Sequence, residues 1–138
     1  MNTPILLAVV TMFSGGISMF FRKVAGFNQV YSPSWMAMQS FAFLIATIVL
    51  HFAQKHPFEL SPRLTGLSIL SAIIGVVGVF SMLHAFKLGG EGSVLFPVAG
   101  LGVIVSVVLS FLVYREPVTP TKLLGLGLGV SSIIVLSR

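Results

Sequence analysis

The chain of 138 residues has no cysteine and no aspartate, and only 8% of its residues are charged. Without cysteine it has neither a disulfide framework nor a thiolate metal ligand. Its three glutamates, Glu59, Glu91 and Glu116, lie between the long apolar runs. The chain therefore lacks the groups needed for catalysis by paired carboxylates, for a metal cluster or for a Ser/His/Asp arrangement. We expect neither an enzyme nor a bound cofactor or metal.

Apolar residues dominate what is present. They make up 56% of the chain, and the mean hydropathy is +1.06. This leaves too little polar surface to cover a soluble core, so we expect a multi-pass protein of the cell membrane, in contact with the lipid bilayer. The eight basic residues are scattered between apolar segments, a pattern that favours lipid headgroups and argues against nucleic acid.

Five apolar stretches are long enough to cross a bilayer core of ~30 Å, which takes roughly 20 helical residues. Four open with a hydroxyl residue followed by proline, a pattern typical of a helix start. The sequence thus predicts an all-α membrane protein, with residues 1–138 forming one domain of five transmembrane helices. The expected spans are residues 4–21, 33–52, 64–86, 93–114 and 120–136.

Basic residues near span ends favour the cytoplasmic side of a membrane. With five spans, four basic residues fall on each face: Arg22, Lys23, Lys87 and Arg138 against Lys55, Arg63, Arg115 and Lys122. An equal count gives no preferred orientation and predicts a dual-topology protein. The alternative is that the Arg22-Lys23 pair beside the first span fixes one orientation, with that face inside.

Polar residues within spans are candidates for a substrate path, because amides and imidazoles in lipid need partners. We single out Ser14, Gln39 and His84, although His84 lies one turn from Lys87 and could simply reach the interface. Pro97 is expected to kink the fourth span, either to line a transport site or only for packing. Trp35 is assigned to an aromatic belt at the membrane interface.

Glycines predict helix packing faces, since small residues let helices approach closely in lipid. The candidates are Gly75 and Gly78 in the third span and Gly125 and Gly129 in the fifth. Glu116 lies in the turn between the fourth and fifth spans, where it has either a turn role or a role in gating.

The stretch "GGEGSVLFPVAGLGVIVSVVLSFLVYREPVTPTKLLGLGLGVSSIIVL" resembles the C-terminal half of an EamA domain, the repeat unit of the drug/metabolite transporter superfamily. Pro97, Glu116 and Gly125 fall on matching positions. "VVTMFSGGISMFFRKVA" is similar to the family's first span, with Lys23 at its terminal lysine, but without the tryptophan often found before its glycine. The resemblance implies a transporter, and Lys23 and Glu116 would support helix ends or a gate.

Most members of this family carry two such domains in inverted orientation, whereas this chain holds one. An antiparallel homodimer would rebuild the ten-span architecture. We therefore expect a transporter of an unknown small molecule, a metabolite or related solute, that works by alternating access. The alternatives are a non-transporting subunit that partners another membrane protein, and a lipid flippase-like role.

Overall fold

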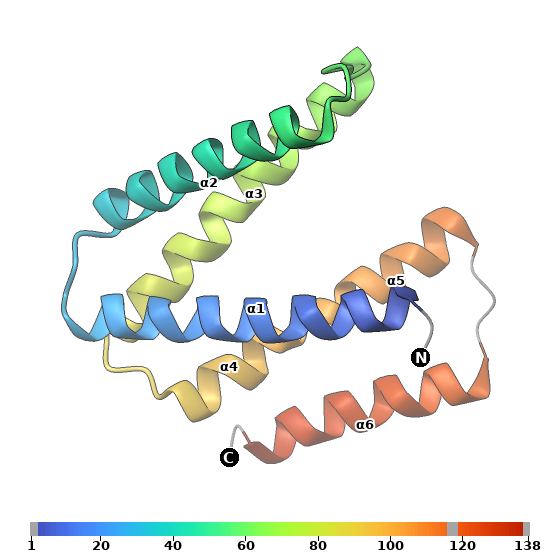
Figure 1. Ribbon diagram of the computed structural model, residues 1–138. Helices are drawn as coiled ribbons and strands as arrows, with labels where there is room; N and C mark the ends of the chain where they lie inside the picture. Colours follow the sequence, from blue (N-terminus) through green and yellow to red (C-terminus); the bar gives the residue numbers. More distant parts are fainter. Residues whose placement is uncertain (1–2, 116–118, 137–138) are drawn as a thin grey trace. The chain divides into compact units, whose positions relative to one another are not determined.

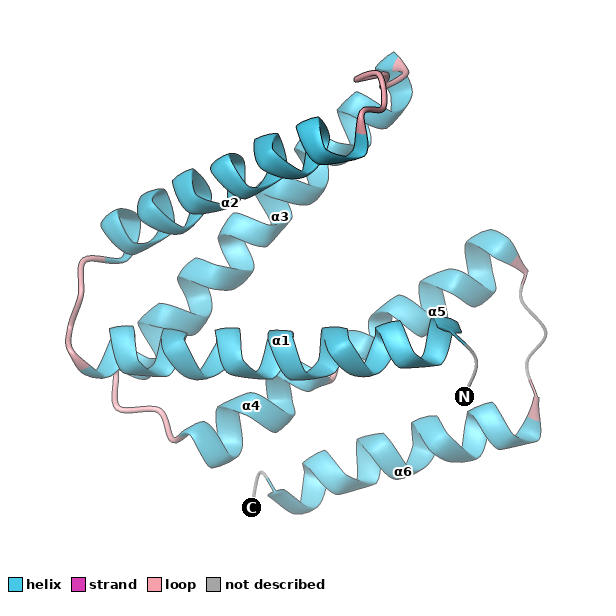
Figure 2. Ribbon diagram, in the orientation of Figure 1, coloured by secondary structure: helices cyan, strands magenta, loops and turns pink. Residues whose placement is uncertain are grey.

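The computed structural model describes residues 3–115 and 119–136, and every regular element in these ranges is an α-helix. Figure 2 shows the helices joined by short turns and loops. The all-α prediction is confirmed. The helices are α1 (Thr3–Phe27), α2 (Ser32–Gln54), α3 (Pro62–Lys87), α4 (Gly92–Gly100), α5 (Gly102–Tyr114) and α6 (Pro120–Leu136).

Helices lie along each of the five expected spans, and the fourth is divided into α4 and α5. Four helical segments are long and apolar enough to cross a membrane: α1, α2, α3, and α4 with α5 taken together as Gly92–Tyr114. A shorter apolar segment, Leu123–Ser132, lies within α6. The chain is therefore a multi-pass membrane protein of about five helices.

The hydroxyl-proline pairs lie at helix starts, but they do not all cap in the same way. Ser61 is the N-cap of α3, and its hydroxyl accepts a hydrogen bond from the Leu64 amide at 3.4 Å. At α2 the N-cap is instead Tyr31, and Ser32 is already the first helical residue, with its side chain buried. Proline in the first turn begins both helices, because its fixed φ suits that position and its missing N–H is not needed there.

Residues 1–89 form one compact unit and residues 90–138 a second. In the first unit, α1 and α3 contact each other near their C-terminal ends, where Ala25, Leu83 and Phe86 are buried. Figure 1 shows α1 diverging from α3 beyond this contact, while α2 and α3 approach each other at the ends joined by their loop. The unit is therefore held at two places and open between them.

Those three side chains are the buried apolar residues of the described chain, and most of the other large apolar side chains are exposed. Phe43, for example, is 76% exposed. In a bilayer such faces contact lipid tails or another helix.

In the second unit, α4 packs against α6 and adjoins α5. The fourth span is broken at Leu101, four residues after Pro97, with Gly100 and Gly102 on either side of the break. There the Leu101 amide donates to the Val98 carbonyl at 3.1 Å, a tighter turn than the α-helix makes. The expected loosening of this span is present, and it lies at the glycines.

Candidate functional site

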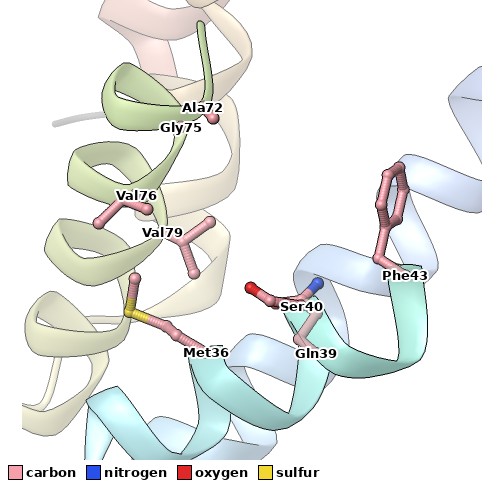
Figure 3. A pocket seen from close by; sticks show the side chains of 8 residues that line it. All are labelled: Met36, Gln39, Ser40, Phe43, Ala72, Gly75, Val76 and Val79. Atoms are coloured by element: carbon pink, nitrogen blue, oxygen red, sulfur yellow. The ribbon is translucent and has the colours of Figure 1, made fainter. Parts of the chain in front are cut away.

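A pocket of about 290 Å³ lies between α2 and α3. We call it the α2–α3 pocket, and Figure 3 shows its eight lining residues. Gln39 and Ser40 on α2 are its polar side chains, and Ala72, Gly75, Val76 and Val79 form the α3 side. The pocket lies in the part of the first unit where the two helices diverge.

A second pocket of about 270 Å³, the α1–α2 pocket, lies between α1 and α2. Its polar side chains are Ser18 and Arg22 from α1 and Trp35 and Gln39 from α2, and the other lining residues are Phe21, Met38 and Ala42. Gln39 therefore lines both pockets.

The helical repeat explains this double role of Gln39. The α2 residues of the first pocket, at 36, 39, 40 and 43, follow the spacing i, i+3, i+4, i+7 of one helix face. Those of the second, at 35, 38, 39 and 42, follow the same spacing one residue earlier. The two faces adjoin along the helix, and Gln39 belongs to both. Gln39 is thus the residue that the two pockets share.

Two residues that line the α1–α2 pocket, Arg22 and Trp35, each carry a nitrogen donor that other atoms cover. The Nε of Arg22 and the Nε1 of Trp35 are buried, and neither has a hydrogen-bond partner among the residues that the structure describes. Sequence reasoning missed both as site residues, because it used Arg22 to count charge and Trp35 as a belt residue. The sequence does indicate that the two residues are close in space, because they lie near the adjoining ends of two helices joined by a short turn.

The other candidates for the substrate path lie elsewhere. The Ser14 hydroxyl donates to the Thr11 carbonyl at 3.1 Å within α1, and the His84 ring stacks on Phe80 with centroids 6.1 Å apart. Both side chains are exposed, and both residues line neither of these two pockets. Pro97 is half-buried in α4, in the second unit. The structure thus brings Gln39 to a pocket, and the path role of all four residues stays a prediction.

The two residues predicted to support helix ends or a gate are placed unequally. Lys23 follows Arg22 near the C-terminal end of α1 and is half-buried. Glu116 lies outside the described residues. The role of each stays a prediction.

The glycines predicted for packing have open space around them. A Cβ added at Gly75, Gly78, Gly125 or Gly129 would meet no atom within 4 Å, and Gly75 lines the α2–α3 pocket. The role of these four glycines in helix packing stays a prediction. The glycine of the α1–α3 contact is Gly26, which carries no spacing motif and was missed.

Comparison with known proteins agrees with a transporter fold. The chain is 26% identical over 138 residues to an uncharacterized protein from Methanocaldococcus jannaschii, covering 99% of this chain and 98% of the other. No solved structure matches the chain. Residues 2–138 match the EamA-like transporter family. With the match running over nearly the whole chain, and with apolar helices and an amide-bearing pocket between them, this protein belongs to the EamA-like transporter family.

Proposed function

We propose that the protein moves a small metabolite or related solute across the cell membrane. Two copies of the chain, each with five spans, would form an antiparallel homodimer and work by alternating access. The observation that carries the proposal is the position of Gln39, an amide on an apolar helix that lines both the α2–α3 pocket and the α1–α2 pocket. A polar group in a membrane helix is costly, so its presence beside open space supports a role in solute contact.

The uncovered small residues support a second copy. Within their own units, Gly15 and Gly16 in α1, Gly75 and Gly78 in α3, and three glycines in α6 have no described atom within 4 Å of an added Cβ. Lipid covers apolar faces well, but rows of small residues are typical of surfaces on which another helix packs. A second five-helix unit would supply such helices.

The basic residues of the first unit support the antiparallel arrangement. The Gln29 side-chain amide donates to the Lys87 carbonyl at 3.1 Å, which joins the α1–α2 turn to the end of α3. Arg22, Lys23 and Lys87 therefore lie toward one end of this unit, while Lys55 and Arg63 flank the loop at the other. With Arg138, Arg115 and Lys122 added, the equal count favours insertion in both orientations.

A test of transport need not assume which solute is carried. Purified protein is reconstituted into liposomes, which are incubated in a cell metabolite extract and washed, and their contents are identified by mass spectrometry. We expect at least one solute to enter protein-containing liposomes and not protein-free ones. Gln39→Leu, which keeps a side chain of similar size and removes the amide, should lower that uptake.

Ser40→Ala is the matched control, since it removes a polar group from the α2–α3 pocket alone. The proposal predicts a larger loss for Gln39→Leu than for Ser40→Ala. Equal contents in protein-containing and protein-free liposomes would contradict transport by this chain alone.

A further inference from the structure

The α2–α3 pocket has two polar side chains that the described chain leaves unpaired. Gln39 and Ser40 are adjacent on α2, both are exposed, and neither side chain makes a hydrogen bond within the described residues. Polar atoms form part of the accessible surface of this pocket, and Figure 3 shows both side chains on the side of α2 that faces α3. Their polar groups are therefore open to a molecule in the pocket.

The Gln39 amide needs partners because of its position in the helix. It is the eighth residue of α2, about 10 Å along the axis from the helix start and within the apolar span. A hydroxyl at such a depth can donate to a carbonyl of its own helix, as the Thr47 hydroxyl does to the Phe43 carbonyl at 2.8 Å. The Gln39 amide makes no such bond, and an unpaired amide in apolar surroundings is unfavourable. An occupant of the pocket that both donates and accepts would satisfy it.

The rest of the pocket argues against a charged occupant. Among the described residues, the eight that line this pocket are uncharged. Arg22 lines the α1–α2 pocket and is not part of this lining. An ion that entered here would give up its hydration without gaining a counter-ion, which is unfavourable. The pocket therefore favours an uncharged solute.

The lining also indicates the shape of that solute. A glutamine amide offers an N–H and a C=O side by side in one plane, so a group that presents the same pair can form two parallel hydrogen bonds with it. Met36, Val76 and Val79 provide an apolar wall, and the volume of about 290 Å³ suits a small molecule. We propose that the α2–α3 pocket binds a small uncharged solute with an apolar body and an amide-type edge, as in a primary amide or a lactam.

This inference deepens the proposed function by naming the chemical class of the solute, and it rests on that function only for the step from binding to transport. Equilibrium binding is measured without any transport step, so the two proposals can fail independently. A helix of a second copy is another possible partner for an amide in a membrane. In that case the pocket would be closed, and no solute would reach Gln39.

The experiment observes the Gln39 amide itself by NMR. The full chain is made by cell-free synthesis with ¹⁵N-glutamine in dodecyl maltoside micelles, which labels Gln29, Gln39 and Gln54. Gln29, whose amide donates to the Lys87 carbonyl, and Gln54, at the C-terminal end of α2, are internal references. The spectrum of Gln39→Leu assigns the Gln39 side-chain signals.

Four probes of one chain length separate charge from hydrogen bonding. Hexanamide is the uncharged probe with the amide edge, and N,N-dimethylhexanamide keeps its carbonyl but has no N–H. Hexanoate and hexylammonium are the anionic and cationic counterparts at neutral pH. We expect a saturable shift of the Gln39 side-chain signals with hexanamide alone, while the signals of Gln29 and Gln54 stay in place.

A variant of the opposite wall tests the position of the site. Ala72→Leu should weaken hexanamide binding by at least about tenfold, because the larger side chain occupies part of the pocket. Ala46→Leu is the matched control, since Ala46 is exposed on α2 and lines neither this pocket nor the α1–α2 pocket. It should leave the affinity within about twofold of wild type.

The proposal is overturned if hexanamide leaves the Gln39 signals unchanged, which is the result expected when a second copy covers the pocket. It is also overturned if the four probes act alike, or if Ala72→Leu and Ala46→Leu have equal effects. Comparison of the probes on the wild-type protein needs no variant of the wall, so it decides the question even if Ala72→Leu fails to fold.

Discussion

Gly26 and Phe86 meet where α1 contacts α3, so closely that a Cβ on Gly26 would overlap the Phe86 Cβ. The same added atom would lie 3.2 Å from the Leu83 carbonyl oxygen. The backbone of α1 thus rests directly on α3, at the place where the buried apolar residues of the described chain are found. One glycine sets the distance between two helices.

We predict that Gly26→Ala lowers the free energy of unfolding by about 1–3 kcal/mol, since the added methyl group must push the two backbones apart. The thermal denaturation midpoint in detergent measures the change. Gly66→Ala on α3 is the control, because Gly66 is outside the glycines proposed to pack against a second copy and no described atom lies within 4 Å of the new methyl group. That change should be neutral or stabilising by up to about 1 kcal/mol, because alanine favours helix over glycine. Equal midpoints for the two variants would contradict the close contact.

The break between α4 and α5 gives a second prediction. Gly100 and Gly102 flank it, and a Cβ at either has open space around it. At each position, alanine favours the helical conformation over glycine by roughly 0.8–1.0 kcal/mol. The double variant should therefore slow amide hydrogen exchange at residues 100–104 in nanodiscs. Pro97→Ala should leave exchange there nearly unchanged, and the reverse result would place the cause of the break at the proline.

The open α2–α3 pocket predicts that Gly75→Leu lowers solute uptake by at least about tenfold, which corresponds to about 1.4 kcal/mol. Gly75 lines the pocket and no described atom lies within 4 Å of an added Cβ, so a leucine side chain would fill pocket space from this position. Gly66→Leu is its control on α3, also in open space and outside this pocket. The denaturation midpoint of each variant is measured alongside uptake, so that a loss of fold is separated from a loss of transport. An equal loss of uptake in both variants would mean that the loss does not come from filling the pocket, and would contradict the prediction.

The absence of cysteine allows a direct test of orientation. Asn28 lies in the α1–α2 turn and Glu59 in the α2–α3 loop, at opposite ends of α2, and both side chains are exposed. In intact cells, Asn28→Cys and Glu59→Cys should each label to about half of their total with a membrane-impermeant thiol reagent, because equal charge on both faces favours neither orientation. Solubilised cells give the total, and the cysteine-free parent gives the background. Labelling of one position alone would mean a fixed orientation and would direct attention to a second subunit.

The spans and the polar residues within them illustrate how far sequence reasoning reached. Apolar length and the hydroxyl-proline pairs were enough to predict the spans, because a membrane helix must satisfy its own backbone and cover a fixed thickness. Gln39 was predicted as a site residue since an amide in an apolar span has few other uses. Ser14 and His84 fulfilled the same criterion; one bonds within its own helix and the other stacks on Phe80, and the path role of all three residues stays a prediction.

The order of residues was thus enough to establish a set of membrane helices with a polar residue at position 39, because hydropathy and helix-start signals are local properties of the chain. Three relationships needed the folded arrangement: Gly26 is a contact point, Gln39 lies between two pockets, and Arg22 and Trp35 share one of them. These relationships depend on which helix faces meet and at what distance. In a membrane, where almost every residue of a span is apolar, periodicity carries little information about which face that is.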